Sequence, residues 1–176
     1  MDFTIAVDVA VPDAVAGLWN VAVTPAEAAT RLFAALLGGF LIGLDREWRD
    51  KPAGLRTHML VSLAAALFTL VAFDIHGDVA GAEPGNAVSD PLRLIEAITA
   101  GVAFLAAGNI IRRGSGVEGL TTGAGLWLAG AVGLSCGRGH FGIAALAVLL
   151  AVIVLSLLRI VTRGVERIRD EDDSPS

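Results

Sequence analysis

Residues 26–44, AEAATRLFAALLGGFLIGL, run directly into residues 45–58, DREWRDKPAGLRTH, so a long apolar stretch is followed at once by a short, highly charged segment. A helix needs about 20 mainly apolar residues to cross the hydrocarbon core of a bilayer, and the first stretch has nearly that length. Four further apolar stretches follow, at about 57–75, 91–111, 119–137 and 141–161. The pattern predicts an all-α integral membrane protein, folded as a compact bundle of five transmembrane helices.

The composition supports this class and excludes others. Hydrophobic residues make up 55% of the 176 residues and charged residues only 18%, and the mean hydropathy is +0.70. Average soluble proteins have about 25% charged residues, so a water-exposed surface would be difficult to cover here. The central part of the chain is nearly balanced in charge, which argues against a nucleic-acid partner. The single cysteine, Cys136, excludes an internal disulfide.

Three regions follow from the distribution of apolar and charged residues. Residues 1–24 form an outer leader, either a short amphipathic helix at the membrane interface or a loosely ordered segment. Residues 25–162 form the five-span transmembrane domain. Residues 163–176 are rich in charge and are expected to form a disordered cytoplasmic tail.

The basic residues predict the orientation in the membrane. Lysine and arginine are frequent in the first and third connections and in the tail, whereas the second connection has none and the fourth has one. Cytoplasmic loops carry the excess of these residues in membrane proteins. We therefore expect the N-terminus outside and the C-terminus in the cytoplasm.

Small residues recur at spacings that allow close contact between helices. Lipid gives helices no hydrophobic reason to associate, so packing at small residues is important. The pairs with four-residue spacing are Gly39/Gly43, Ala103/Ala107 and Gly133/Gly137. They predict a compact bundle and also suggest a homodimer.

The charged first connection is the strongest candidate site. Its polar cluster comprises Asp45, Arg46, Glu47, Lys51, Gly54, Arg56, Thr57 and His58. The i, i+4 spacing of Asp45/Arg49 and Glu47/Lys51 predicts that the first helix continues until Pro52 stops it. A tight turn at Gly54 would then bring Arg56 towards Asp45 or Glu47. The alternative is a solvated loop with ordinary ion pairs.

The third and fourth spans contain a second polar group, Arg93, Glu96, Asn109, Thr121 and Thr122. Glu96 should face the bundle and pair with Arg93 or a neighbouring span, because an ionisable side chain facing lipid is costly. A structural ion pair and a metal or proton site are both open for Glu96. Asn109 is interpreted as a helix–helix contact, and the two threonines as caps of the fourth span.

The outer connection supplies weak candidate metal ligands in Asp74, Asp78 and Asp90. Carboxylate oxygens suit Mg²⁺, although acidic outer loops are also tolerated without any metal. No cofactor is firmly implied, and Mg²⁺ is possible. The sequence lacks a recognisable catalytic constellation, so we do not expect an enzyme.

Several of these segments together resemble the signature of the MgtC/SapB family of bacterial membrane proteins. The similar segments are LIGLDRE at 41–47, KPAGLRTH at 51–58, DPLR at 90–93, AFLAAG at 103–108, VEGLTT at 117–122 and LW at 126–127. Asp45 stands where the family usually has Glu, and Ala103 and Ala106 replace two glycines. Many members also carry a soluble C-terminal domain, whereas here we expect the hydrophobic domain alone.

The resemblance implies a multi-pass protein of the bacterial plasma (inner) membrane, linked to magnesium homeostasis and, in pathogens, to virulence. Two molecular functions are compatible with the sequence. The first is a non-enzymatic regulator or interaction partner of another membrane protein complex. The alternative is a transporter or channel for Mg²⁺ or another small solute. Acidic residues occur near both ends of the spans and are scarce midway, which favours the regulator.

Overall fold

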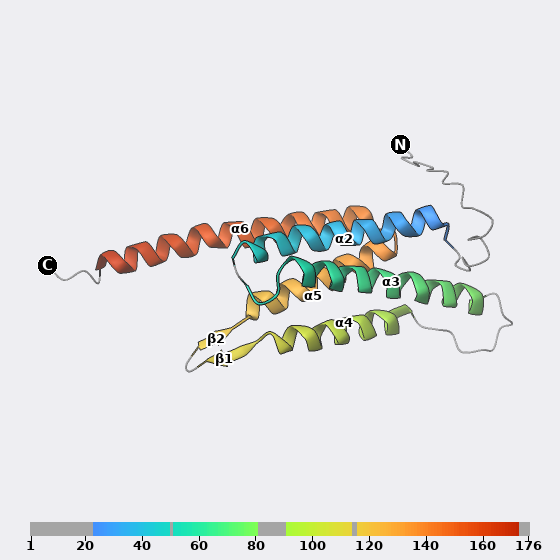
Figure 1. Cartoon of the computed structure of the whole chain (residues 1–176), viewed down its shortest axis with the longest axis horizontal. Helices are drawn as coiled ribbons and strands as arrows, with labels where there is room; N and C mark the ends of the chain where they lie inside the picture. Colours follow the sequence, from blue (N-terminus) through green and yellow to red (C-terminus); the bar gives the residue numbers. More distant parts are fainter. Residues whose placement is uncertain (1–22, 50, 81–90, 114–115, 173–176) are drawn as a thin grey trace.

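The computed structural model describes residues 23–49, 51–80, 91–113 and 116–172, with side chains undefined at 76–80, 91, 113 and 157–172. The described residues form five helices and one short pair of antiparallel strands (Figure 1). The helices are α2 Pro25–Glu47, α3 Leu55–Ala80, α4 Pro91–Gly108, α5 Leu120–Gly137 and α6 Phe141–Asp172. The antiparallel strands are β1 Ile111–Arg113 and β2 Gly116–Glu118, and Arg112 pairs with Val117.

Each of the five apolar stretches corresponds to a helix, so the expected helical class is confirmed. Within the described parts of the chain, three helical segments are long and apolar enough to cross a bilayer, namely Pro25–Glu47, Leu55–Ile75 and Leu120–Gly137. A shorter apolar segment, Phe141–Ser156, belongs to α6. The chain is therefore mostly helical and has the composition of a membrane protein.

The structure corrects the expected bounds of the third span. The sequence predicts that span 3 reaches residue 111, but α4 ends at Gly108 and the antiparallel strands β1 and β2 follow it. Ile110, Ile111 and Val117 are β-branched, and the sequence has Gly-Ser-Gly at 114–116. Branched residues beside a glycine-rich turn favour a hairpin over a helix.

The expected disorder of the tail is also corrected, because α6 continues through residues 163–172. The sequence contains no proline between 141 and 172. A helix that has already formed extends readily where no residue breaks it, since propagation is far easier than nucleation.

The two ends of the bundle can be followed in Figure 1. One end holds the α2–α3 connection, the hairpin and the far part of α6. The other end holds the start of α2 and the α5–α6 junction. This arrangement places the arginine-rich connections together at one end, as the expected orientation requires.

Helix α5 forms the centre of the bundle and contacts α2, α3, α4 and α6. Its buried positions are mainly glycine, alanine and small aliphatic residues. A Cβ atom on Gly137 would lie 2.6 Å from the Ala66 carbonyl oxygen of α3, and one on Gly133 would collide with the Ser62 carbonyl oxygen. The close helix contact predicted for this pair of glycines is therefore confirmed.

The glycine pair of α2 is confirmed in the same way. A Cβ on Gly39 would lie 2.6 Å from the His58 carbonyl oxygen, and one on Gly43 would lie 2.8 Å from the Leu55 Cα atom. Helix α3 is thus held between a glycine pair of α2 and a glycine pair of α5.

The expected contact face of α4 is wrong. Ala103 and Ala107 are exposed, whereas Val102 and Ala106 are buried. A Cβ on Gly130 of α5 would lie 2.9 Å from a Val102 methyl group. The small residue of this contact is supplied by α5, so α4 can present a branched side chain to it.

Candidate functional site

The polar cluster lies where α2 ends. Helix α2 ends at Glu47, and the Arg46 carbonyl oxygen accepts hydrogen bonds of 3.2 Å from the backbone N–H groups of both Arg49 and Lys51. This turn replaces the expected helical continuation to Pro52. The expected Glu47/Lys51 ion pair is not found between these two described side chains.

Asp45 and Arg49 form the i, i+4 pair that the sequence predicts. Arg49 Nη2 lies 2.6 Å from Asp45 Oδ1 and also donates to the Leu155 carbonyl oxygen of α6 at 3.2 Å. The side chain of Arg49 is only 24% exposed and that of Asp45 only 17%. The pair therefore ties the end of α2 to α6 in a partly desolvated position, where charge-assisted hydrogen bonds are strong.

Arg46 is the buried member of the cluster, with 3% of its surface exposed. Its Nε lies 3.9 Å from Asp45 Oδ2, so one carboxylate serves two guanidinium groups. Five buried side-chain atoms of the described residues have no hydrogen-bond partner: Asp45 Oδ2, Arg46 Nε, Arg49 Nε, His58 Nε2 and Ser62 Oγ. Unsatisfied polar atoms are rare in protein interiors, and their concentration here marks a candidate functional site.

Glu47 connects the two helices. Its Oε2 accepts a 2.9 Å hydrogen bond from the Leu55 backbone N–H at the start of α3. A carboxylate at a helix N-terminus satisfies a free N–H group and interacts well with the helix dipole. A Cβ on Gly54 would collide with the end of this flexible side chain, so glycine leaves the space in which Glu47 makes its contact.

His58 is fully buried one turn into α3. Its Nδ1 lies 2.8 Å from the Gly54 carbonyl oxygen. A carbonyl oxygen only accepts, so Nδ1 carries the hydrogen, and in the neutral ring Nε2 has a free lone pair. Nε2 faces Gly125 of α5, where a Cβ would approach it to 3.0 Å.

Arg56 does not approach Asp45 or Glu47 as expected. Arg56 and Thr57 are exposed, and so is Lys51. The reason is the phase of α3: because His58 faces the bundle, the two preceding residues point outwards. Arg49 takes the place beside Asp45 that the sequence interpretation gave to Arg56.

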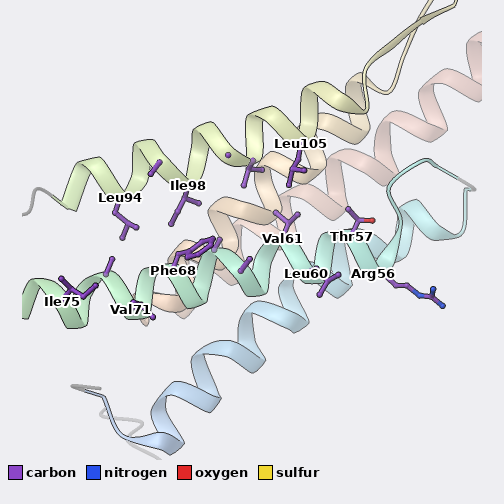
Figure 2. Close-up of a pocket in the computed structure, with 16 residues that line it drawn as sticks. Arg56, Thr57, Leu60, Val61, Phe68, Val71, Ile75, Leu94, Ile98 and Leu105 are labelled. Carbon is purple, nitrogen blue, oxygen red and sulfur yellow. The ribbon is translucent and has the colours of Figure 1, made fainter. Parts of the chain in front are cut away.

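Arg56 and Thr57 instead lie at one end of an apolar groove between α3 and α4 (Figure 2). The groove has a volume of about 840 Å³, and Figure 2 shows the Arg56 side chain extending away from it. Its walls are formed by residues such as Val61, Phe68, Ile98 and Leu105.

Arg93 and Glu96 do not pair as expected. Both side chains are exposed on α4, and within the described part of the chain neither has an ion-pair partner. Glu96 lies on the face of Ala103 and Ala107, which turns away from α5 because Val102 and Ala106 occupy the contact.

The remaining polar residues of spans 3 and 4 have local roles. Asn109 follows the end of α4, and its Nδ2 donates to the Leu105 carbonyl oxygen at 2.9 Å, so its partner lies in its own helix.

Thr121 and Thr122 lie inside α5 and do not cap it. The N-cap is Gly119, which has a left-handed φ of 87° that suits glycine. Thr122 is buried and Thr121 is exposed.

The outer metal candidates are only partly described. Asp74 is half-buried near the end of α3. The Asp78 side chain and the whole of Asp90 lie outside the described residues. In the part that the structure covers, no group of three or more His, Cys, Asp or Glu side chains is arranged to hold a metal ion.

Ser62 was not identified from the sequence as part of the site. It is completely buried one turn after His58, and its Oγ is one of the unpartnered atoms. The four-residue spacing from His58 was the available signal, but serine is common in membrane helices. At the other end of the bundle, Glu27 and Arg31 form an i, i+4 ion pair, and Arg31 also donates to the Gly137 carbonyl oxygen at 3.0 Å.

The fold and the cluster define a helical membrane protein with a partly buried group of charges at one end of its bundle. The family model described as the MgtC family matches residues 32–164. The chain therefore belongs to the MgtC family.

Curated relatives support the assignment. Protein MgtC of Brucella abortus is 40% identical over 134 residues, which is 76% of this chain and 52% of the relative. Protein MgtC of Salmonella typhimurium is 40% identical over 128 residues, 73% of this chain and 51% of the relative. An uncharacterized protein of Synechocystis is 38% identical over 141 residues, 80% of this chain and 53% of the relative. The chain spans about half the length of these relatives. No solved structure gives a significant match.

Proposed function

We propose that this chain is a multi-pass protein of the bacterial inner membrane and acts as a non-enzymatic regulator or interaction partner of another membrane complex. In this proposal all five apolar helices cross the bilayer, with the N-terminus outside and the C-terminus in the cytoplasm. Membership of the MgtC family supports a role in magnesium homeostasis and, in pathogens, in virulence.

The observation that supports a regulator best is the packing of the interior. The buried polar side chains of the described residues are Arg46, His58, Ser62, Thr69 and Thr122. Only Arg46 and His58 are ionisable, and both lie at the cytoplasmic end of the proposed orientation. A cation crossing the bundle would lose its water and find few replacements midway.

The surface of the same end offers contacts to a partner. Trp48 is 79% exposed directly after α2, and Lys51 and Arg56 are exposed beside it along the connection. Tryptophan and arginine are the residue types most often found at energetic centres of protein interfaces. A cytoplasmic partner with an acidic surface would fit this connection.

The alternative, a transporter or channel, is favoured by one feature of α3. His58, Ser62 and Thr69 are all completely buried on its inner face. The Thr69 hydroxyl donates to the Ala65 carbonyl oxygen at 2.7 Å, whereas His58 Nε2 and Ser62 Oγ have no partner. Protons or water could use such a row of groups.

A flux measurement distinguishes the two functions. Purified protein in liposomes that contain Mg²⁺ and pH indicators should give no flux above protein-free liposomes. Saturable uptake that is lost in Ser62→Ala would overturn the regulator in favour of transport.

A cellular measurement tests the regulator directly. The double variant Trp48→Ala, Arg56→Ala should abolish the activity of the protein in bacteria grown at low Mg²⁺, at an unchanged membrane level. Phe33→Ala is the control, because Phe33 is also largely exposed on α2 but lies away from the connection. Full activity of the double variant would contradict a partner contact at this surface.

A further inference from the structure

The groove between α3 and α4 lacks a filling element in the described chain. Of the sixteen residues that line it, fourteen are apolar, and only Arg56 and Thr57 at one end are polar. Along α3 the lining extends from Arg56 to Ile75, which corresponds to about 28 Å at 1.5 Å per residue. The hydrocarbon core of a bilayer is about 30 Å thick. The groove therefore crosses the whole core, which fits a helix better than one lipid chain from a single leaflet.

The α4 wall of the groove is shaped for the close approach of another backbone. Ala97, Gly101 and Leu105 line it at steps of four residues. A Cβ on Gly101 would meet no atom within 4 Å, whereas the glycines at helix contacts, such as Gly39 and Gly133, face backbone atoms of a neighbour. Because Gly101 lies in the groove wall, the absence of its Cβ leaves room for another helix backbone to approach closely.

The charges on α4 indicate which partner. Arg93 continues the row of Ala97 and Gly101 by one more step of four residues, and Glu96 lies next to Ala97. Both charged side chains are exposed, and in the described part of the chain neither has an ion-pair partner. One helix thus presents a cation and an anion one turn apart beside a small-residue motif. Such a surface is complementary to a second copy of itself.

We propose that α4 of a second copy occupies the groove, so that the chain forms a two-fold symmetric dimer in the membrane. Ala97 and Gly101 of the two copies meet near the axis, as small residues do in transmembrane helix pairs. Arg93 of each copy then pairs with Glu96 of the other. This arrangement removes two unpaired charges per copy from the lipid-facing surface, where they are costly. The dimer goes beyond the proposed function and does not depend on it.

A glycine substitution tests the dimer without disturbing the monomer. Gly101→Leu adds a side chain where the single chain has free space, so the monomer should fold normally. Gly142→Leu on α6 is the matched control, because a Cβ on Gly142 also meets nothing within 4 Å. The stoichiometry of fluorescently labelled protein in lipid vesicles is counted by single-molecule photobleaching over a range of protein-to-lipid ratios. The wild type and Gly142→Leu should be dimers at ratios where Gly101→Leu is monomeric.

The charge pairing has its own test. Arg93→Glu should give monomers under the same conditions, and so should Glu96→Arg. The double variant Arg93→Glu, Glu96→Arg should restore the dimer, because the pairing is then reversed in both copies. Circular dichroism and thermal stability in detergent check that each variant is folded.

The outcomes separate the dimer from its alternatives. A monomeric wild type at all protein-to-lipid ratios overturns the proposal, and so does a dimer that persists in folded Gly101→Leu. Phospholipid retained on monomers in native mass spectrometry, with no dimer, would show that lipid fills the groove instead. None of these results depends on flux or on activity in cells, so the dimer and the proposed function can fail independently.

Discussion

At the scale of single residues, the unusual feature is a buried guanidinium with little to balance it. Arg46 is 3% exposed, and the Asp45 carboxylate is shared between Arg46 and Arg49. Removing one partner of a buried ion pair is far more costly than the pair is stabilising, because the remaining charge stays desolvated. Within the cluster, removing the charge of Asp45 should therefore cost the most free energy of unfolding.

We predict that Asp45→Asn lowers the free energy of unfolding by roughly 2–4 kcal/mol, somewhat below the full cost for a buried pair because Asp45 is partly exposed. Chemical denaturation in detergent, followed by circular dichroism, measures the change. Glu27→Gln is the control, because Glu27 forms the same i, i+4 pair with Arg31 but is 47% exposed. Its loss should cost about 1 kcal/mol or less. Equal effects of the two substitutions would contradict the role given to burial.

We also predict that Gly54→Ala destabilises the α2–α3 connection by about 1–2 kcal/mol. The added Cβ would displace the Glu47 carboxylate, and the Leu55 N–H would lose its acceptor. Gly142→Ala should be neutral or slightly stabilising, since its Cβ enters open space in a helix. The difference in melting temperature between these two variants in detergent is the measurement. A Gly54→Ala protein as stable as the control would contradict a stabilising role for the Glu47 contact.

At the scale of the helices, the positions of the helices can be predicted from the lengths of the apolar stretches, and the contacts between helices are determined by the positions of glycine residues. The ends of α5 could be predicted to within one residue because Gly119 and Arg138 interrupt an otherwise apolar run. The outward face of α4 could not be predicted. It depends on the packing of Val102 against Gly130 of α5, which the sequence of α4 alone does not reveal. The hairpin was missed because Ile110 and Ile111 extend the apolar pattern of α4 past Gly108 and Asn109, so the sequence favours a longer helix.

The same reasoning holds within the polar cluster. The Asp45/Arg49 pair could be predicted because both residues lie on one helix at a fixed spacing. The separation of Arg56 from Asp45 could not be predicted, because it depends on the rotation of α3 about its own axis. That rotation is set by His58 packing against the glycines of α2 and α5.

We predict that Gly133→Ala is among the most damaging methyl additions in the bundle, with a loss of about 1–3 kcal/mol or more. The added Cβ would collide with the Ser62 carbonyl oxygen, and a backbone atom in a packed helix cannot move aside easily. Gly142→Ala is the control, because its Cβ meets no atom of the chain within 4 Å. Thermal unfolding in detergent should separate the two by several degrees. A stable Gly133→Ala protein would show that α3 and α5 pack less closely than the structure indicates.

At the scale of the whole molecule, the proposed orientation gives a prediction that the structure makes more specific. Ala53 in the first connection is only 1% exposed, so a cysteine there would react poorly. Lys51 in the same connection and His140 at the α5–α6 junction are both exposed. The α2–α3 connection and the α5–α6 junction lie at opposite ends of the bundle (Figure 1). Lys51 and His140 are therefore the better pair of positions for labelling.

Single Lys51→Cys and His140→Cys variants should react with a membrane-impermeant maleimide from opposite sides. In intact cells whose outer membrane has been permeabilised, His140→Cys should label and Lys51→Cys should not, whereas both should label after the inner membrane is opened. The native Cys136 is buried and serves as the unlabelled background. This result is expected because the arginine-rich end of the bundle should remain in the cytoplasm. The reverse pattern would invert the orientation, and equal labelling in intact cells would exclude a bundle that spans the membrane as proposed.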